Sequence, residues 1–158
     1  MINAANVALG RWGQNLVNSI QGKSEKIRIS AGATRTVSKA ADYAKKQGFP
    51  LYDSYEPVLA DATIDAIIVA TPHTQRVEII TAAATAGKHV FTEKPLALNQ
   101  RDADVCIKAC AAHNVTLAVG YNWRFQAALQ EIRRMLDDGR LGKLLHIEGN
   151  FCGPSVYR

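Results

Sequence analysis

The chain has 158 residues, 47% hydrophobic and 21% charged, which suits one domain with a substantial core. No apolar run approaches the roughly 20 residues of a membrane span, and the first residues lack the basic start of a secretory signal, so we expect a cytoplasmic protein with no membrane partner. The net charge is +5, and the basic residues are scattered along the chain, which favours a solvated surface over a nucleic-acid patch and still admits a small anionic ligand. We therefore expect no nucleic-acid partner.

The cysteines indicate no disulfide framework. Cys106 and Cys110 fall on one face of a predicted helix, and Cys152 stands alone near the end. We expect reduced, buried thiols in the helix. A metal site would need more ligands than His113, the histidine close to them in sequence, so we expect none.

Short apolar runs alternate with helical patterns throughout the chain. The predicted strands are 7–9, 27–33, 64–70, 89–92, 116–120 and 144–151, and the predicted helices are 13–20, 37–47, 74–86, 99–113 and 126–138. Gly48, Gly87 and Gly139 follow helices as terminating glycines, and Asn99 precedes one as a cap. This alternation predicts an α/β fold of the Rossmann type, a doubly wound and mostly parallel sheet with both faces covered.

The first strand runs into a helix through a turn that resembles a dinucleotide fingerprint. Ala8, Gly10 and Gly13 occupy the three glycine positions of the G-x-G-x-x-G pattern, with Arg11 and Trp12 between the last two. Gly10 would let the backbone approach a pyrophosphate, and Gly13 would let helix and strand pack closely. The alternative is a tight strand-to-helix turn without a ligand.

The loop after the second strand indicates which dinucleotide would bind. NAD-binding domains place an acid there for the adenosine ribose, whereas residues 31–39 contain none. Thr34, Arg35, Ser38 and Lys39 would instead bind a ribose phosphate, because guanidinium and hydroxyl groups suit phosphate oxygens. We therefore expect NADP to be preferred, with NAD possible; the alternative is an ordinary polar loop.

A second chemical motif follows the strand 89–92. Glu93, Lys94 and Pro95 stand where ligands bind in an open α/β sheet, and the proline fixes the backbone after the lysine. The alternative is a strand end whose lysine meets solvent.

In this order and spacing the motifs resemble the amino-terminal half of the Gfo/Idh/MocA oxidoreductases, the family of glucose–fructose oxidoreductase and inositol dehydrogenase. The resemblance rests on the turn at 10–13, on Ala70-Thr71-Pro72, on residues 86–90 leading into Glu93-Lys94-Pro95, and on residues 120–125. It implies a Rossmann domain at 1–121, followed at 122–158 by a connecting helix and the first strand of a truncated second α/β domain.

The resemblance also implies roles for individual residues. Lys94 would lie beside the nicotinamide and the substrate hydroxyl as the catalytic residue, Glu93 near the nicotinamide ribose, and Asn122 and Arg124 at the nicotinamide end. The complete candidate cofactor-binding set is Gly10, Arg11, Trp12, Gly13, Thr34, Arg35, Ser38, Ala70, Thr71, Pro72, His73, Glu93, Lys94, Asn122 and Arg124.

The chain departs from the family pattern in two ways. His73 and Arg76 stand where members commonly carry Asn and His, so the usual contacts there cannot be carried over. The family's catalytic His and Asp come from the second domain, and we read His146 as a structural residue rather than a replacement. We therefore expect residues 1–158 to be incomplete for catalysis.

The resulting expectation is an NAD(P)-dependent oxidoreductase that transfers hydride between nicotinamide and a sugar, polyol or cyclitol-like alcohol or ketone. The full-length protein is expected to form a homo-oligomer. Two alternatives stay open: a non-catalytic, cofactor-sensing regulator of the same fold, and a stand-alone nucleotide-binding module.

Overall fold

A computed structural model describes residues 1–150 of the protein. The chain divides into two units, residues 1–120 and a second unit that begins at Tyr121. Each unit is described on its own below.

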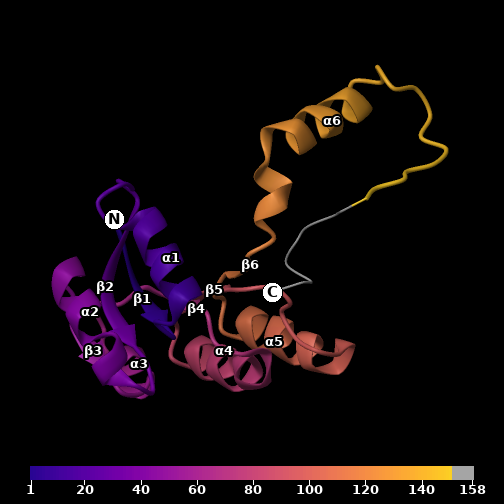
Figure 1. The fold of residues 1–158 in the computed structure, drawn as a ribbon. Helices are drawn as coiled ribbons and strands as arrows, with labels where there is room; N and C mark the ends of the chain where they lie inside the picture. The colour runs from indigo at the N-terminus through magenta and orange to yellow at the C-terminus, as the bar shows by residue number, and fades with distance from the viewer. Residues whose placement is uncertain (151–158) are drawn as a thin grey trace. The chain divides into compact units, whose positions relative to one another are not determined.

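Six parallel strands form the centre of the first unit, in the order β3-β2-β1-β4-β5-β6 (Figure 1). The strands are β1 (Ile2–Val7), β2 (Ile27–Ala33), β3 (Leu51–Tyr52), β4 (Ala66–Val69), β5 (His89–Thr92) and β6 (Leu117–Val119). The chain moves outward from β1 in one direction as far as β3, then crosses back to β4 and continues the other way. This arrangement confirms the predicted doubly wound α/β fold and places its switch point between β1 and β4.

Helices cover both faces of this sheet (Figure 1). They are α1 (Arg11–Ile20), α2 (Ala41–Gln47), α3 (Glu56–Ala60), α4 (Arg76–Thr85) and α5 (Gln100–Ala112), with single 3₁₀ turns η1 (Val37–Lys39) and η2 (His73–Gln75). The second unit contains η3 (Asn122–Phe125) and α6 (Ala127–Asp137).

The hydrophobic core lies in two layers because successive strand side chains point to opposite faces. Ile67 of β4 packs with α3, α4 and α5 in one layer, whereas its neighbour Ile68 packs with α1 and α2 in the other. The α1 layer is only partly covered within the first unit. A mostly apolar groove of about 560 Å³ lies there, over β1, β4 and β5 beside α1.

The first predicted strand was wrong in position. Strand β1 covers Ile2–Val7 rather than 7–9, and it ends because Ala8 has a left-handed backbone, with φ of 79°. Residues 2–6 carry alanines and asparagines, which have low strand propensity, so pairing with β2 and β4 on both sides decides the conformation.

The region between β2 and β4 also differs from the prediction. The predicted helix 37–47 is broken at Ala40, whose φ of −124° and ψ of −2° separate η1 from α2. Strand β3 and helix α3 were not predicted, because segments of two and five residues are too short to show a hydrophobic period.

The observed helix ends agree with those predicted from the sequence. The Asn99 side chain accepts a hydrogen bond of 2.9 Å from the amide of Asp102, and Gly48, Gly87 and Gly139 each have positive φ after a helix. Cys106 and Cys110 are free and buried on α5, as expected. Burial raises the pKa of the Cys106 thiol to about 11.

The strand predicted at 144–151 is absent from the residues that the structure describes. Residues 144–150 form no strand and are exposed, while Phe151 and Cys152 lie outside the described part. Alternating side chains favour a strand only when a neighbouring backbone supplies hydrogen bonds, and none pairs with 144–150 among the described residues. His146 is therefore exposed and not on a strand.

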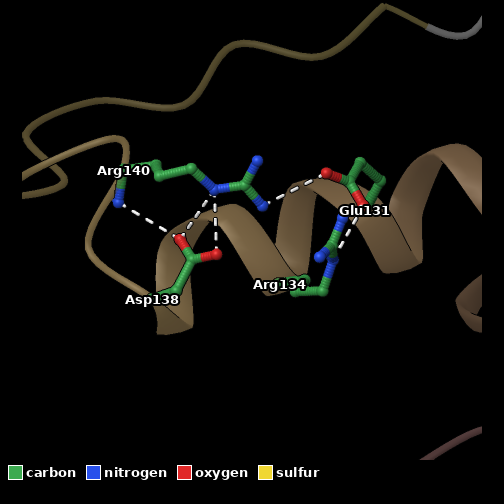
Figure 2. Close-up of polar contacts among 4 residues, drawn as sticks. All are labelled: Glu131, Arg134, Asp138 and Arg140. Atoms are coloured by element: carbon green, nitrogen blue, oxygen red, sulfur yellow. Dashed lines mark hydrogen bonds and ion pairs between the residues drawn. The ribbon is translucent and has the colours of Figure 1, made fainter.

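The second unit carries a network of ion pairs along α6 (Figure 2). Glu131 lies between Arg134 at 2.6 Å and Arg140 at 3.2 Å, and Arg140 also pairs with Asp138 at 2.8 Å. All four side chains are exposed, so each pair contributes at most about 1 kcal/mol.

No helix between residues 1 and 150 is long and apolar enough to span a membrane.

At Gly13, helix α1 lies directly against the backbone that follows β1. A β-carbon on Gly13 would lie 1.9 Å from the carbonyl oxygen of Ala8, whereas one on Gly10 would meet nothing within 4 Å. The helix can hold its position only if residue 13 has no side chain.

We therefore expect Gly13→Ala to lower the free energy of unfolding by about 1–3 kcal/mol, as overpacking typically does. Gly10→Ala is the matched control and should change it by less than about 1 kcal/mol. Urea denaturation of both variants measures the difference. Equal stability of the two would contradict the packing described here.

Candidate functional site

The loops that follow the strands meet at the carboxyl edge of the sheet. The amide of Ala8 donates to the carbonyl of Ala33 at 2.8 Å, and the amide of Ala70 donates to that of Val7 at 2.9 Å. These bonds hold the loops after β1, β2 and β4 side by side. In open α/β sheets, ligands bind at this edge beside the switch point.

The turn after β1 leaves the amino end of α1 open. Gly10 is the N-cap residue, is exposed, and provides no side-chain hydrogen bond to the helix. The first turn contains no acidic residue, and Arg11 and Trp12 in it are exposed. Free amides and the positive end of the helix dipole make such a terminus suitable for an anion.

A buried asparagine holds this turn in place through a side-chain hydrogen bond. Asn6 is fully buried, and its side-chain amide donates to the carbonyl of Ala8 at 3.1 Å. Its Oδ1 has no hydrogen-bond partner among the described residues. Sequence reasoning missed Asn6, although a polar residue inside an apolar strand is a usable signal.

A cavity of about 390 Å³ lies next to the turn, between the loops after β1, β2, β3 and β4. Four predicted site residues line it together: Thr34, Arg35, Thr71 and Pro72. The remaining lining residues are Val7, Ala8, Ala33, Thr36, Asp53, Ser54, Tyr55, Glu56, Gln75, Glu78 and Ile79.

One wall of this cavity was missed by the sequence analysis. Asp53, Tyr55 and Glu56 come from the loop after β3 and the start of α3, two elements that were not predicted. The Tyr55 hydroxyl donates to Glu78 Oε1 on α4 at 2.9 Å. Burial first, and Glu78 second, raise the pKa of Tyr55 to about 12.

The loop after β4 carries an unsatisfied hydroxyl. Thr71 is buried, and its Oγ1 has no hydrogen-bond partner in the described part of the chain. Thr71 also lines the cavity, so a ligand bound there would lie beside the residue that carries this unsatisfied hydroxyl. The backbone carbonyl of Thr71 accepts a hydrogen bond of 3.0 Å from Nε of Arg76.

The loop after β5 contains an exposed lysine directly after a buried glutamate. Glu93 is buried, and its Oε2 accepts a hydrogen bond of 3.2 Å from the backbone amide of Lys94, whose side chain is exposed. Gly120, at the end of β6, lies so close that a β-carbon there would be 3.1 Å from Glu93 Oε1. The Glu93 carboxylate is thus confined between two strand ends.

The other predicted residues are placed as follows. Gly10, Arg11, Trp12 and Gly13 form the turn and the first turn of α1; Ser38 lies in η1 and His73 in η2, both exposed; Ala70 follows β4. Asn122 and Arg124 lie in η3 of the second unit and are exposed. Their roles stay predictions.

The geometry of the first unit alone is suited to binding a dinucleotide. Gly10 leaves open space for a pyrophosphate at the uncapped end of α1, and the adjoining cavity offers the free Thr71 hydroxyl and the Arg35 guanidinium. Both features lie at the switch point of the sheet. No cluster of side chains able to hold a metal ion occurs within residues 1–150.

Comparison with known proteins gives the same result. The model of a family described as "Oxidoreductase family, NAD-binding Rossmann fold" matches residues 2–121. The scyllo-inositol 2-dehydrogenase (NAD(+)) of Bacillus subtilis is 31% identical over 94% of this chain, and the inositol 2-dehydrogenase of Rhizobium meliloti is 30% identical over 93%. The chain covers 44% of each, so it spans less than half the length of these relatives.

Two of the solved structures of similar fold are also inositol dehydrogenases. Scyllo-inositol dehydrogenase from Lactobacillus casei, with bound NAD(H) and scyllo-inositol, matches with a TM-score of 0.84 and 26% identity. The match covers 90% of this chain and 43% of that one. Myo-inositol 2-dehydrogenase from Lactobacillus plantarum matches at 0.83 with 25% identity, over 91% and 43% of the two chains.

The burial of Tyr55, together with its contact with Glu78, predicts a pH dependence of stability. The unfolded chain loses the Tyr55 proton near pH 10, whereas the folded protein keeps it up to about 12. The folded state therefore binds more protons in this window, and the free energy of unfolding should fall as the pH rises from 10 towards 12.

Tyr55→Phe should flatten part of that decline, because phenylalanine has no proton to lose. Urea denaturation at several pH values between 9 and 12 measures the slope, with Tyr121→Phe, an exposed tyrosine outside the cavity, as the control. A slope unchanged by Tyr55→Phe, or reduced equally by the control, would contradict the assignment.

Proposed function

We propose, since the chain belongs to the Gfo/Idh/MocA oxidoreductase family with an NAD-binding Rossmann fold, that it holds a nicotinamide dinucleotide for the oxidation or reduction of a polyol. The observation that carries this proposal is the pairing, at one sheet edge, of an uncapped helix end at Gly10 with a cavity containing the unsatisfied Thr71 hydroxyl. Bound there, the cofactor supplies the hydride chemistry.

The chain's own residues divide the binding between two positions. Backbone amides at the start of α1 hold the pyrophosphate, and the absence of a side chain at Gly10 lets it approach. The adenosine end lies in the 390 Å³ cavity, where Thr71 and the wall from Asp53 to Glu56 surround it.

Preference for NADP over NAD is a finer part of the proposal. Thr34 and Arg35 line the cavity just past β2, and residues 31–39 contain no acid. The acids that line the same cavity, Asp53, Glu56 and Glu78, come from the loop after β3, from α3 and from α4. The guanidinium of Arg35 can form charge-assisted hydrogen bonds with that phosphate. The Bacillus relative is named for NAD(+), so this preference would distinguish the present chain from it.

Lys94 is the proposed catalytic residue of this chain. Its exposed ammonium stands at the carboxyl end of β5, directly after the confined Glu93 carboxylate. There it donates a hydrogen bond to the substrate oxygen, orients it, and helps to move its proton during oxidation or reduction. Glu93 holds the backbone of Lys94 in place through the bond from the Lys94 amide.

The substrate class is proposed from the relatives. Both curated relatives named above are inositol dehydrogenases, so a cyclitol, a related polyol or a sugar is the expected substrate. We further propose that residues 122–158 begin a second domain, which supplies the His and Asp needed for turnover and the contacts of a homo-oligomer. Activity tests therefore use the full-length gene product.

Arg35→Ala should weaken NADPH binding by roughly 10–100-fold, the loss of a contact worth about 1.5–3 kcal/mol. NADH binding should change by less than about threefold, because no phosphate faces Arg35 in that cofactor. Calorimetric titration of the parent protein and the variant with both cofactors measures this.

Arg101→Ala, which removes an exposed arginine from α5, is the matched control and should leave both affinities unchanged. Equal affinity of the parent protein for the two cofactors would contradict the NADP preference. If the Arg35→Ala variant still prefers NADPH to NADH, the preference does not depend on Arg35, and its assignment to this residue is wrong.

Lys94→Ala in the full-length gene product should lower kcat by roughly 10²–10⁴, as loss of a positioned proton-transfer group does. Lys94→Arg should not restore turnover, since a guanidinium stays protonated and has a different shape. The dissociation constant of the dinucleotide should change much less, because the phosphates are bound elsewhere.

Steady-state kinetics on a panel of inositols, polyols and sugars, with fluorescence titration of NADPH, separates the two effects. Lys45→Ala, an exposed lysine on α2, is the control. Near-normal kcat in Lys94→Ala would return Lys94 to a surface role, whereas the absence of turnover in the parent full-length protein would favour the non-catalytic alternative.

A further inference from the structure

We propose that Arg76 is a positioning residue that holds the backbone around Lys94 in place by joining the loops after β4 and β5. The inference rests on the proposed catalytic role of Lys94. It assigns a function to a residue at which this chain departs from the pattern of its family.

Arg76 is the first residue of α4 and is only 5% exposed, which is unusual for an arginine. Its guanidinium donates to three backbone carbonyls. Nε bonds to Thr71 at 3.0 Å, and Nη1 bonds to Glu93 at 2.6 Å and also to Pro95. No acidic side chain within residues 1–150 lies close enough to Arg76 to form an ion pair.

The carbonyls at Glu93 and Pro95 belong to the residues immediately before and after Lys94. One nitrogen, Nη1, therefore holds the backbone on both sides of the proposed catalytic lysine. The bond to Thr71 ties the same guanidinium to the wall of the dinucleotide cavity. Arg76 thus sets the separation between the cavity and Lys94.

The charge of Arg76 is retained at this buried position. Burial lowers the pKa of the guanidinium, and the negative charge of Glu93 opposes this effect. Arginine stays protonated in proteins, and its rigid planar fork can bond to several carbonyls in fixed directions. A lysine at this position would retain the charge without the fork, and a histidine would retain fewer donors.

A purely structural role is the competing explanation. A residue that only stabilises the fold would lower activity in proportion to the fraction of protein unfolded, and its effect would add to that of Lys94→Ala. A residue that acts through Lys94 would change kcat in folded protein and would have little effect once the lysine is gone.

The experiment uses the full-length gene product with Arg76→Lys and Arg76→Met, each alone and combined with Lys94→Ala. Arg28→Met, which removes an exposed arginine at the amino end of β2, is the control. Circular dichroism establishes the folded fraction, and Arg76→Lys keeps the test usable if Arg76→Met does not fold.

We expect folded Arg76→Lys to lower kcat by roughly 10–100-fold, the scale of a misplaced reacting group. KM for the polyol and the dissociation constant of NADPH should change by less than about threefold, because binding is unperturbed. In the Lys94→Ala background, the same substitution should cost less than about threefold. Full additivity would overturn the proposal, and so would an unchanged kcat.

Hydrogen exchange provides a readout that needs no turnover. The amides of Glu93, Lys94 and Leu96 should exchange at least about tenfold faster in Arg76→Lys, while β1 and β2 keep their protection. Unchanged exchange at the amides of residues 93, 94, 96 and 97 would overturn the positioning role even if the protein proved inactive. A normal kcat in Lys94→Ala alone would instead refute the proposed catalytic role of Lys94, and the two failures are therefore distinguishable.

Discussion

The carbonyl oxygen of Ala8 and the α-carbon of Gly13 approach so closely that no side chain fits between them. This contact sets the angle at which α1 leaves β1, and therefore directs the open end of the helix towards the carboxyl edge of the sheet. Asn6 holds the same carbonyl from beneath through its side-chain amide. The anion site and the neighbouring cavity both depend on this short turn.

The sequence predicted the architecture well where hydrophobic patterns were long. Strands β2 and β5 and helices α5 and α6 lie within one residue of their predicted bounds, because periodic apolar residues and caps such as Asn99 specify them locally. Strand β1 was misplaced, because pairing on both sides overrides the weak propensity of its alanines and asparagines. The strand expected at 144–151 failed for the opposite reason, since nothing pairs with residues 144–150 within the described chain.

The candidate site was predicted in part. Thr34, Arg35, Thr71 and Pro72 were predicted to bind the cofactor, and all four line one cavity. The wall containing Tyr55 and Glu78 was not foreseen, because it depends on a two-residue strand and on a hydrogen bond between residues 23 positions apart. The buried contacts of Arg76 likewise join residues up to 19 positions apart, and only the folded chain brings them together.

The central claim is that the turn after β1 holds the pyrophosphate of a dinucleotide and the adjoining cavity holds its adenosine end. Amide chemical shifts of the ¹⁵N-labelled protein during titration with NADPH test it most directly. The account predicts the largest changes at residues 10–13 and 34–35, with further changes at Thr71. Changes confined to the apolar groove beside α1, or none at saturating NADPH, would contradict it.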